Sequence, residues 1–340
     1  MTTAATDDDA EADAEDSAVD DESVDRAPNS AADSDEGPAS STTTDSRTAT
    51  RTESGTAEST PTGDDRYTRK RCVLITGCSS GIGKATARAF LEEDWQVVAT
   101  ARNLEDVADL DDAGCHTLEL DVTDSARVPR VVERAVEIGG AIDCLVNNAG
   151  YAQLGPLEDI STADMHRQYD VNVYGPHRLI RAALPHMRAQ ESGRIINVSS
   201  VFGRIAVGGT GAYAGSKHAL EAMSDALRAE VEAFDIEVVV VEPGPVETSL
   251  RERMTDEAPQ ERTTAYESVY DLFEDAQLVG GGGPLAVEPD DVAAAIVHAG
   301  TCPEPPARYP VGPVAEYGLY ARFLPDRLRD AAFGLVQRLV

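Results

Sequence analysis

Six short apolar runs, separated by amphipathic stretches, limit the fold of this chain more than any other feature of its sequence. The runs occupy residues 72–76, 96–100, 117–120, 142–146, 194–198 and 236–241. Short runs rich in β-branched residues with helical stretches between them are typical of parallel strands buried on both faces. We therefore expect one doubly wound α/β domain over residues 67–340, with a seven-stranded, mainly parallel sheet. Ligands of such a domain bind outside the carboxyl ends of the strands.

Residues 1–66 have a different composition from the rest of the chain. They contain 19 of the 61 acidic residues and almost no large apolar side chain. A segment of this kind cannot bury enough surface to offset its conformational entropy. We expect a disordered acidic tail, and a solubilising role is favoured over a role as a partner-binding arm.

The formal net charge of −32 argues against nucleic acid and anionic lipid as partners, because an anionic surface repels phosphate. The only lysines are Lys70, Lys84 and Lys217, so arginine supplies nearly all of the positive charge. Lysine depletion with excess acid is similar to the proteome of an extreme halophile, where concentrated salt screens the repulsion between carboxylates. The alternative is an acidic protein that docks on a basic partner. A small molecule is the expected ligand.

Neither a disulfide framework nor a metal site is indicated. The five cysteines are odd in number and lack C-x-x-C spacing, and the six histidines are scattered. The sequence starts without a basic segment followed by an apolar one, and it has no apolar run of about 18 residues. We expect a cytoplasmic protein without stable membrane insertion.

The turn after the first run is rich in glycine. Glycines between a strand and a helix allow a tight bend, so that a pyrophosphate can bind the free N–H groups of the helix start. Here the spacing is G-x-x-x-G-x-G rather than the usual G-x-G-x-x-G, and a helical stretch follows. We expect a dinucleotide site here rather than an ordinary turn. Its expected contact residues are Thr76, Gly77, Ser79, Ser80, Gly81, Ile82 and Gly83.

The end of the second run indicates which nicotinamide cofactor binds. An acidic residue there would bind the adenosine ribose 2′-hydroxyl, whereas an arginine would bind a 2′-phosphate. Ala101 stands where the acid is expected, and Arg102 follows. The sequence therefore predicts NADP, with NAD as the alternative if Arg102 only points to solvent.

Polar residues also follow the third and fourth runs. Asp121 can accept the adenine amino group beside Val122, although Asp121 or Thr123 can equally cap the next helix. The fourth run leads into an amide-rich segment that can tie adjacent strands together and border the cofactor ribose. Its residues are Asn147, Asn148, Ala149 and Gly150.

Four further residues suggest catalysis. Tyr213 and Lys217 are spaced i, i+4, so both can project from one face of a helix, and Ser200 ends the fifth run. Asn172 is a polar amide in the helix expected around residues 165–177. A phenol with a pKa near 10 needs a lower value to act near neutral pH. We expect the Lys217 ammonium, together with an oxidised nicotinamide, to lower the pKa of Tyr213.

In this order and spacing, these residues resemble the short-chain dehydrogenase/reductase family over about residues 71–250. The resemblance implies a Rossmann-type fold and a proton exchanged by Tyr213 while hydride passes between cofactor and substrate. It implies that Ser200 binds the substrate oxygen, Lys217 binds the nicotinamide ribose and Asn172 holds a water behind Lys217. Pro243, Gly244, Val246 and Thr248 match the family segment that contacts the nicotinamide. Within the family, the sequence is most similar to NADP-preferring, retinol and hydroxysteroid dehydrogenase-like members.

The C-terminal third is expected to hold a substrate lid and an apolar helix. The lid corresponds to residues 250–284, where Tyr266 and Tyr270 face an apolar substrate or form local core. An apolar stripe on a helix at 324–340 suggests packing against the body or in a homodimer or homotetramer. The overall prediction is an NADP-dependent enzyme that interconverts an alcohol and a carbonyl. A non-catalytic NADP-binding sensor is the alternative.

Overall fold

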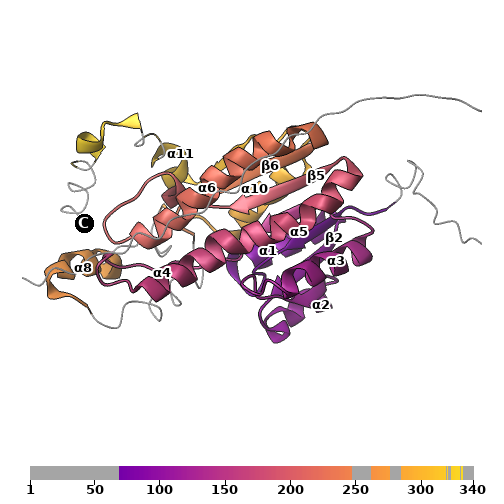
Figure 1. Ribbon diagram of the computed structural model, residues 1–340, viewed down its shortest axis with the longest axis horizontal. Helices are drawn as coiled ribbons and strands as arrows, with labels where there is room; N and C mark the ends of the chain where they lie inside the picture. The colour runs from indigo at the N-terminus through magenta and orange to yellow at the C-terminus, as the bar shows by residue number, and fades with distance from the viewer. Residues whose placement is uncertain are drawn as a thin grey trace, which may run out of the picture. The chain divides into compact units, whose positions relative to one another are not determined.

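The computed structural model describes residues 69–246, 262–275, 285–318, 320, 323–329 and 331, with side chains in the second of these ranges as far as residue 271. The expected acidic tail at 1–66 lies outside the described residues, as do Thr248 and much of the expected lid. The part that is described contains the whole sheet and its covering helices (Figure 1).

The sheet has seven strands, all paired in parallel, in the order β3-β2-β1-β4-β5-β6-β7. This confirms the predicted fold class. The strands are β1 Cys72–Ile75, β2 Gln96–Ala101, β3 His116–Glu119, β4 Cys144–Asn147, β5 Gly193–Val198, β6 Ile236–Pro243 and β7 Arg308–Val311. The order reverses between β1 and β4, so the connections from these strands cross to opposite faces of the sheet and open a crevice at their carboxyl ends.

Helices cover both faces of the sheet because the central strands are buried on both sides, as all four residues of β1 and β4 are. On one face, the apolar sides of α1, Gly81–Glu92, and α10, Pro289–Thr301, pack into a core cluster with β1, β2, β5 and β6. On the other face, α3, Arg127–Gly139, and α5, Gly175–Gln190, form the second cluster, with the end of α6, Gly211–Val231. Figure 1 shows α3 and α5 side by side in front of the sheet.

The helix expected around residues 165–177 is present but is not a regular α-helix. It begins as α4, Thr162–Tyr169, continues through a π-helical turn at Asp170–Tyr174 and resumes as α5. Pro176 at the start of α5 has no N–H to donate, which prevents a regular α ladder here. Asn172 lies inside the π-helical turn, a feature that is frequent at functional sites.

The remaining elements connect this framework. Short helices are α2, Ala108–Asp112, α8, Glu267–Asp275, and α11, Pro313–Gly318. The 3-10 turns are η2 Leu104–Val107, η4 Val201–Gly203, η5 Glu232–Phe234 and η6 Thr264–Tyr266. Among the helices of the described residues, none has both the length and the apolar character needed to cross a membrane.

The expected C-terminal helix is described only in part. Residues 326–329 are helical, and most of the stretch beyond them lies outside the described residues. Leu324 and Leu328, two members of the expected apolar stripe, are 43% and 60% exposed. These two side chains therefore do not pack into the body of the domain.

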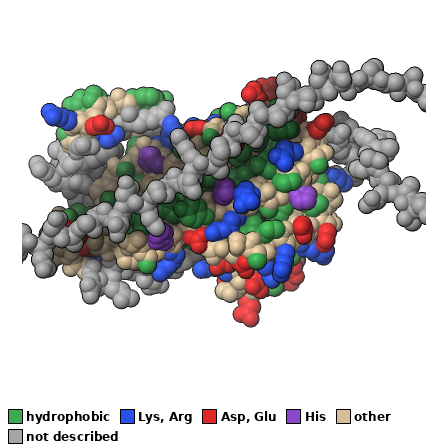
Figure 2. Space-filling model, viewed as in Figure 1, with side chains coloured by type: hydrophobic (Ala, Val, Ile, Leu, Met, Phe, Trp, Pro, Cys, Tyr) green, Lys and Arg blue, Asp and Glu red, His purple; other side chains and the backbone are tan. Residues whose placement is uncertain are grey.

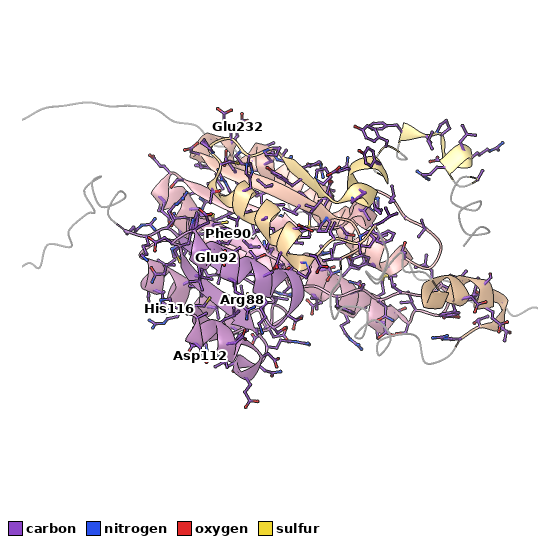
Figure 3. All side chains as sticks on the ribbon, turned by 180° about the vertical axis from the view of Figure 1, so that it is seen from behind. Arg88, Phe90, Glu92, Asp112, His116 and Glu232 are labelled. Atoms are coloured by element: carbon purple, nitrogen blue, oxygen red, sulfur yellow. The ribbon has the colours of Figure 1, made fainter. Side chains whose placement is uncertain are left out.

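The packing of the core predicts how much stability is lost when a central aromatic side chain is removed. Phe90 on α1 is fully buried, contacts Trp95 edge-on at 5.0 Å and packs closely against Gly300 of α10 (Figure 3). Phe90→Ala should lower the free energy of unfolding by about 3–5 kcal/mol, because it removes apolar burial and leaves a cavity. Chemical denaturation measures this change. Leu104→Ala, at a side chain that is 47% exposed, is the control and should change stability by no more than about 0.5 kcal/mol.

Candidate active site

The glycine-rich turn between β1 and α1 has the backbone shape that a dinucleotide cradle needs. Gly77 and Gly81 have φ angles of +73° and +55°, which favour glycine. A Cβ at Gly83 would lie 2.3 Å from Gly77 O and 2.4 Å from the Asn148 side chain, so no other residue fits without rearrangement. The first turn of α1 contains no acidic residue, so the partial positive charge of the helix start is not neutralised there.

Side chains tie the end of β1 to the end of β4. The Thr76 hydroxyl accepts hydrogen bonds from the backbone N–H groups of Asn148 and Ala149, at 3.1 and 3.0 Å. In return, the Asn148 amide donates to Thr76 O at 2.9 Å and to Gly77 O at 3.1 Å. These four bonds hold the glycine turn against the neighbouring strand end at the point where the strand order reverses.

A second set of side-chain bonds crosses to the next strand. Asn147 is 2% exposed, and its amide donates to Asn197 Oδ1 at 2.8 Å. Asn197 then donates to the Ser224 hydroxyl on α6 at 2.9 Å. The structure thus gives Asn147 and Asn148 the strand-tying role expected of them.

Arg102 and Asp121 both lie at strand ends on the β2–β3 side of the site. Arg102 directly follows β2 and is exposed, so its guanidinium is accessible to a ligand. Asp121 is exposed, and its carboxylate accepts hydrogen bonds from the N–H and the hydroxyl of Thr123. The expectation that Asp121 or Thr123 caps the next helix is wrong, because α3 begins only at Arg127. Asp124 is the residue whose carboxylate accepts the N–H groups at its start.

Asn172 connects the π-helical turn to the segment after β4. Its Oδ1 accepts the N–H of Tyr151 at 3.1 Å, and its Nδ2 donates to Tyr151 O at 2.9 Å and to the Ser216 hydroxyl at 3.1 Å. A Cβ at Gly150 would lie 3.1 Å from Asn172 Oδ1 and 3.6 Å from Lys217 Nζ. Asn172, Gly150 and Lys217 therefore meet in one place, although they are far apart in the sequence.

Tyr213 and Lys217 lie together, as their spacing predicts. Both are in the first two turns of α6, and Lys217 Nζ lies 5.8 Å from the centre of the Tyr213 ring. Lys217 is 5% exposed and donates a hydrogen bond of 2.8 Å to Val198 O, at the end of β5. Ser200 follows that strand end. Its hydroxyl accepts the N–H of Phe202 at 3.2 Å and is hydrogen-bonded to Tyr213, which favours the ionised phenol.

The protein environment alone shifts the pKa of Tyr213 upward, so the lowering expected with an oxidised nicotinamide stays a prediction. Burial raises the pKa of Tyr213 to about 12, and the hydrogen bond with Ser200 opposes this only in part. Burial also lowers the pKa of Lys217 to about 8, because it disfavours the ammonium. Two adjacent groups in a buried site are thus both shifted toward their neutral forms. At neutral pH the phenol is protonated and is a proton donor.

The segment after β6 is held from both sides. The N–H of Gly244 donates to Val311 O of β7 at 3.0 Å, and Pro245 O accepts the N–H of Val287 at 2.9 Å. Val246 also forms a β-bridge with Val287. The segment from Pro243 to Val246 is therefore fixed at the edge of the crevice, while Thr248 lies outside the described residues.

The described part of the expected lid is bonded to a loop before α4. Tyr266 donates to the Glu158 carboxylate at 2.6 Å, and Tyr270 donates to Asp159 at 2.5 Å. Asp159 also accepts the N–H and hydroxyl of Thr263. Tyr270 is 7% exposed, which fits the expectation of local core under the loop.

These residues fit a nicotinamide dinucleotide. The glycine cradle would hold the pyrophosphate, and Lys217 with the Asn147–Gly150 segment would border the ribose. In the described part of the chain, no three His, Cys, Asp or Glu side chains form a group that could hold a metal ion.

The buried lysine generates a prediction about pH. With a folded pKa of about 8 and an ordinary value of 10.5, Lys217 destabilises the fold fully below pH 8, and this effect disappears by about pH 10.5. Between these limits the unfolded chain binds more protons, so the contribution of Lys217 to stability rises by at most about 1.4 kcal/mol per pH unit. The buried cysteines change stability with pH in the opposite direction, but they do so equally in the wild type and in the variants. The stability of wild type should therefore rise relative to Lys217→Met as the pH goes from 8 to 10, in denaturation curves.

Lys84→Met is the matched control, since Lys84 is a partly exposed lysine paired with Asp109. The difference in stability between wild type and this control should not change in the same way. If the stability of wild type and of Lys217→Met changed with pH in parallel, the lowered pKa assigned to Lys217 would be contradicted.

Comparison with known proteins identifies the family. The family model for short chain dehydrogenases matches residues 71–259. The retinol dehydrogenase 8 of Bos taurus is 36% identical over 255 residues, which cover 70% of this chain and 80% of that protein. An NADPH-dependent 3-dehydrocapnine reductase of Ornithobacterium rhinotracheale is 33% identical over 273 residues, covering 77% of this chain and 96% of that protein.

A solved structure gives the same result for the fold. A short-chain dehydrogenase from Streptomyces avermitilis superposes with a TM-score of 0.67 and 34% identity, covering 79% of this chain and 97% of that one. Together with the glycine cradle and the meeting of Asn172, Ser200, Tyr213 and Lys217, these matches identify the chain. It is an oxidoreductase of the short-chain dehydrogenase/reductase family.

Proposed function

We propose that this enzyme uses NADP(H) to interconvert an alcohol and a ketone or aldehyde. The observation that carries the proposal is the convergence of Ser200, Tyr213 and Lys217 beside the glycine cradle. Lys217 Nζ lies 5.8 Å from the Tyr213 ring, and Tyr213 is hydrogen-bonded to Ser200. The crevice thus combines a proton donor, a hydrogen-bonding hydroxyl and a cation in one place.

In the reductive direction, Tyr213 gives its proton to the carbonyl oxygen of the substrate while Ser200 stabilises that oxygen with a hydrogen bond. A bound nicotinamide would supply the hydride for the carbonyl carbon in reduction and would accept a hydride in oxidation. Lys217 stabilises the negative charge that develops on the phenol oxygen. Asn172 bonds to Tyr151 and to Ser216, which holds the π-helical turn against α6. In the proposed mechanism, this turn supports the proton path behind Lys217.

The preference for NADP rests on the residues after β2. Ala101 leaves no carboxylate to repel a phosphate, and the exposed guanidinium of Arg102 can bind one with paired hydrogen bonds. A relative described as NADPH-dependent supports the same preference. When the cofactor is bound, Asp121 and Val122 would border the adenine, and the segment 243–248 would contact the nicotinamide carboxamide.

The substrate is partly apolar. Phe202 packs edge-on against the Tyr213 ring at 6.1 Å, and Leu157, which is 61% exposed, lies against the start of α6 at Gly211. An aromatic ring against the proton donor and an exposed leucine near the start of the same helix favour a carbonyl compound with an apolar body. A short charged substrate would find few partners there.

The surface charge supports the proposal that this enzyme is active in concentrated salt. The chain has 61 acidic residues against 29 basic ones, and Figure 2 shows acidic side chains gathered around α2 and α3. The five cysteines are free, and Cys72, Cys78, Cys115 and Cys144 are buried, which suits the reducing cytoplasm of a halophile. The exposed Leu324 and Leu328 support a homo-oligomeric form.

Tyr213→Phe separates the enzyme from a sensor that only binds the cofactor. The variant keeps the ring packing but loses the proton, so turnover should fall by about 10²–10⁴-fold. NADPH binding, measured by the cofactor's fluorescence, should change by less than about threefold. Turnover is measured as NADPH consumption with a panel of ketones and aldehydes in high salt. Unchanged turnover would contradict the proposed mechanism.

Arg102→Ala tests the cofactor preference. Hydrogen bonds to a charged group contribute about 1.5–3 kcal/mol, so the KM for NADPH should rise by about 10–150-fold while the KM for NADH stays within twofold. Arg130→Ala, at an exposed arginine of α3, is the matched control and should change neither value. Similar KM values for NADH and NADPH in the wild type would overturn the preference for NADP.

A further inference from the structure

Two glutamates and two arginines form a buried cluster next to the site. Glu221 of α6 and Glu242 of β6 are 3% and 1% exposed. Arg308 of β7 donates to both carboxylates, at 3.0 Å to Glu242, and also to Asp225 at 2.6 Å. Arg204, in the loop after η4, approaches Glu221 at 3.7 Å and Glu242 at 3.8 Å. We name Glu221, Glu242, Arg204 and Arg308 the Glu–Arg cluster.

Three of the four members of the Glu–Arg cluster lie within four residues in sequence of a part of the catalytic site. Arg204 lies four residues after Ser200, at the end of the 3-10 turn that the Ser200 hydroxyl caps. Glu221 lies one helical turn beyond Lys217 and two turns beyond Tyr213 on α6. Glu242 directly precedes Pro243, where the nicotinamide segment begins. The cluster therefore joins three segments of the site that come from separate parts of the chain.

The packing around Glu221 shows how closely these segments are fitted. A Cβ at Gly203 would lie 2.9 Å from Glu221 Oε1 and 2.4 Å from Ser199 Oγ. The turn after Ser200 thus rests directly on the Glu221 carboxylate. A shift of that carboxylate would move the turn and, with it, the Ser200 hydroxyl.

Such an ion cluster is a poor source of stability, because removing its two carboxylates and part of its two guanidinium groups from water costs about as much as their attraction returns. Well-packed apolar residues could join these elements equally well. The charges do supply directional bonds between elements that come from distant parts of the chain. Two glutamates and two arginines also balance, so the pairing holds only while all four are charged.

On the basis of the proposed function, we propose that the Glu–Arg cluster is a positioning network, which sets the Ser200 turn and the nicotinamide segment relative to Tyr213. Its members do not touch the reacting atoms. They act through the three segments that carry them, and a misplacement of about 1 Å in such a site reduces turnover by about 10²-fold.

The cluster also makes this positioning sensitive to acid. Burial, with a further contribution from Asp225, raises the pKa of Glu242 to about 6, against the attraction of Arg204. The charged groups that face it in the described residues are Glu221 and Asp225 from α6, Arg204 from the loop and Arg308 from β7. Below pH 6 Glu242 becomes neutral, so both Arg308 and Arg204 lose one of their two charged glutamate partners.

The test compares Glu242→Gln with Glu237→Gln. Glu237 lies at the other end of the same strand, where it pairs with Arg194 and not with a member of the Glu–Arg cluster. Glu242→Gln should lower kcat for carbonyl reduction by about 10–100-fold, leave NADPH binding within about threefold and remove the fall in kcat below pH 6. Glu237→Gln should lower stability but leave kcat and its pH profile unchanged. Equal kcat values for the two variants would overturn the proposal.

A second variant guards against a simple loss of folding. Glu242→Gln combined with Arg204→Gln leaves no unpaired buried charge, so it should unfold at nearly the wild-type temperature. If the cluster positions the site, kcat of this double variant stays low. A return of kcat to the wild-type value would show a purely structural role and overturn the proposal.

Hydrogen–deuterium exchange separates this proposal from the proposed function. Glu242→Gln should speed exchange at residues 200–205 and 243–246, whereas Glu237→Gln should not. If the wild type reduces no carbonyl compound of the panel, the proposed function fails while the exchange result still decides the role of the cluster. Unchanged exchange in Glu242→Gln would overturn the network itself.

Discussion

The site depends on how the sheet satisfies its backbone at the point where the strand order reverses. The connections from β1 and β4 leave toward opposite faces, so N–H and C=O groups at these strand ends have no ladder partners. Thr76 and Asn148 replace the missing bonds, as the hydroxyl accepts two N–H groups and the amide donates to two carbonyls. The crevice stays open because side chains, rather than another strand, close the hydrogen bonding.

Deeper in the crevice, a strand end in turn provides the hydrogen-bond partner of a buried charge. The Lys217 ammonium is 5% exposed and donates a hydrogen bond to the Val198 carbonyl, at the end of strand β5. Burial lowers the pKa of Lys217 to about 8 and raises that of Tyr213 to about 12. A ligand that brings negative charge near the ammonium would offset part of the cost of burying it.

The sequence was sufficient for the parts of the fold that repeat a local pattern. Continuous apolar runs located six strands, and i, i+4 spacing placed Tyr213 beside Lys217. The seventh strand, Arg-Tyr-Pro-Val, was not located because only Val311 is buried in it. The π-helical turn at Asp170–Tyr174 was missed because a helical period does not distinguish it from an α-helix. The sign of the tyrosine pKa shift depends on burial, which no spacing reveals.

The Glu–Arg cluster was missed for a related reason, and it shows where such functional residues are found. Its closest bonds link residues 66 and 87 positions apart, so no local motif contains them. A glutamate before a proline-glycine pair and another on an amphipathic helix both resemble surface residues in an acidic chain. Only burial distinguishes them, because an unpaired carboxylate at these positions would be too costly to retain. In a protein whose surface is crowded with acid, the informative carboxylates are therefore the few that the fold removes from water and pairs with arginine.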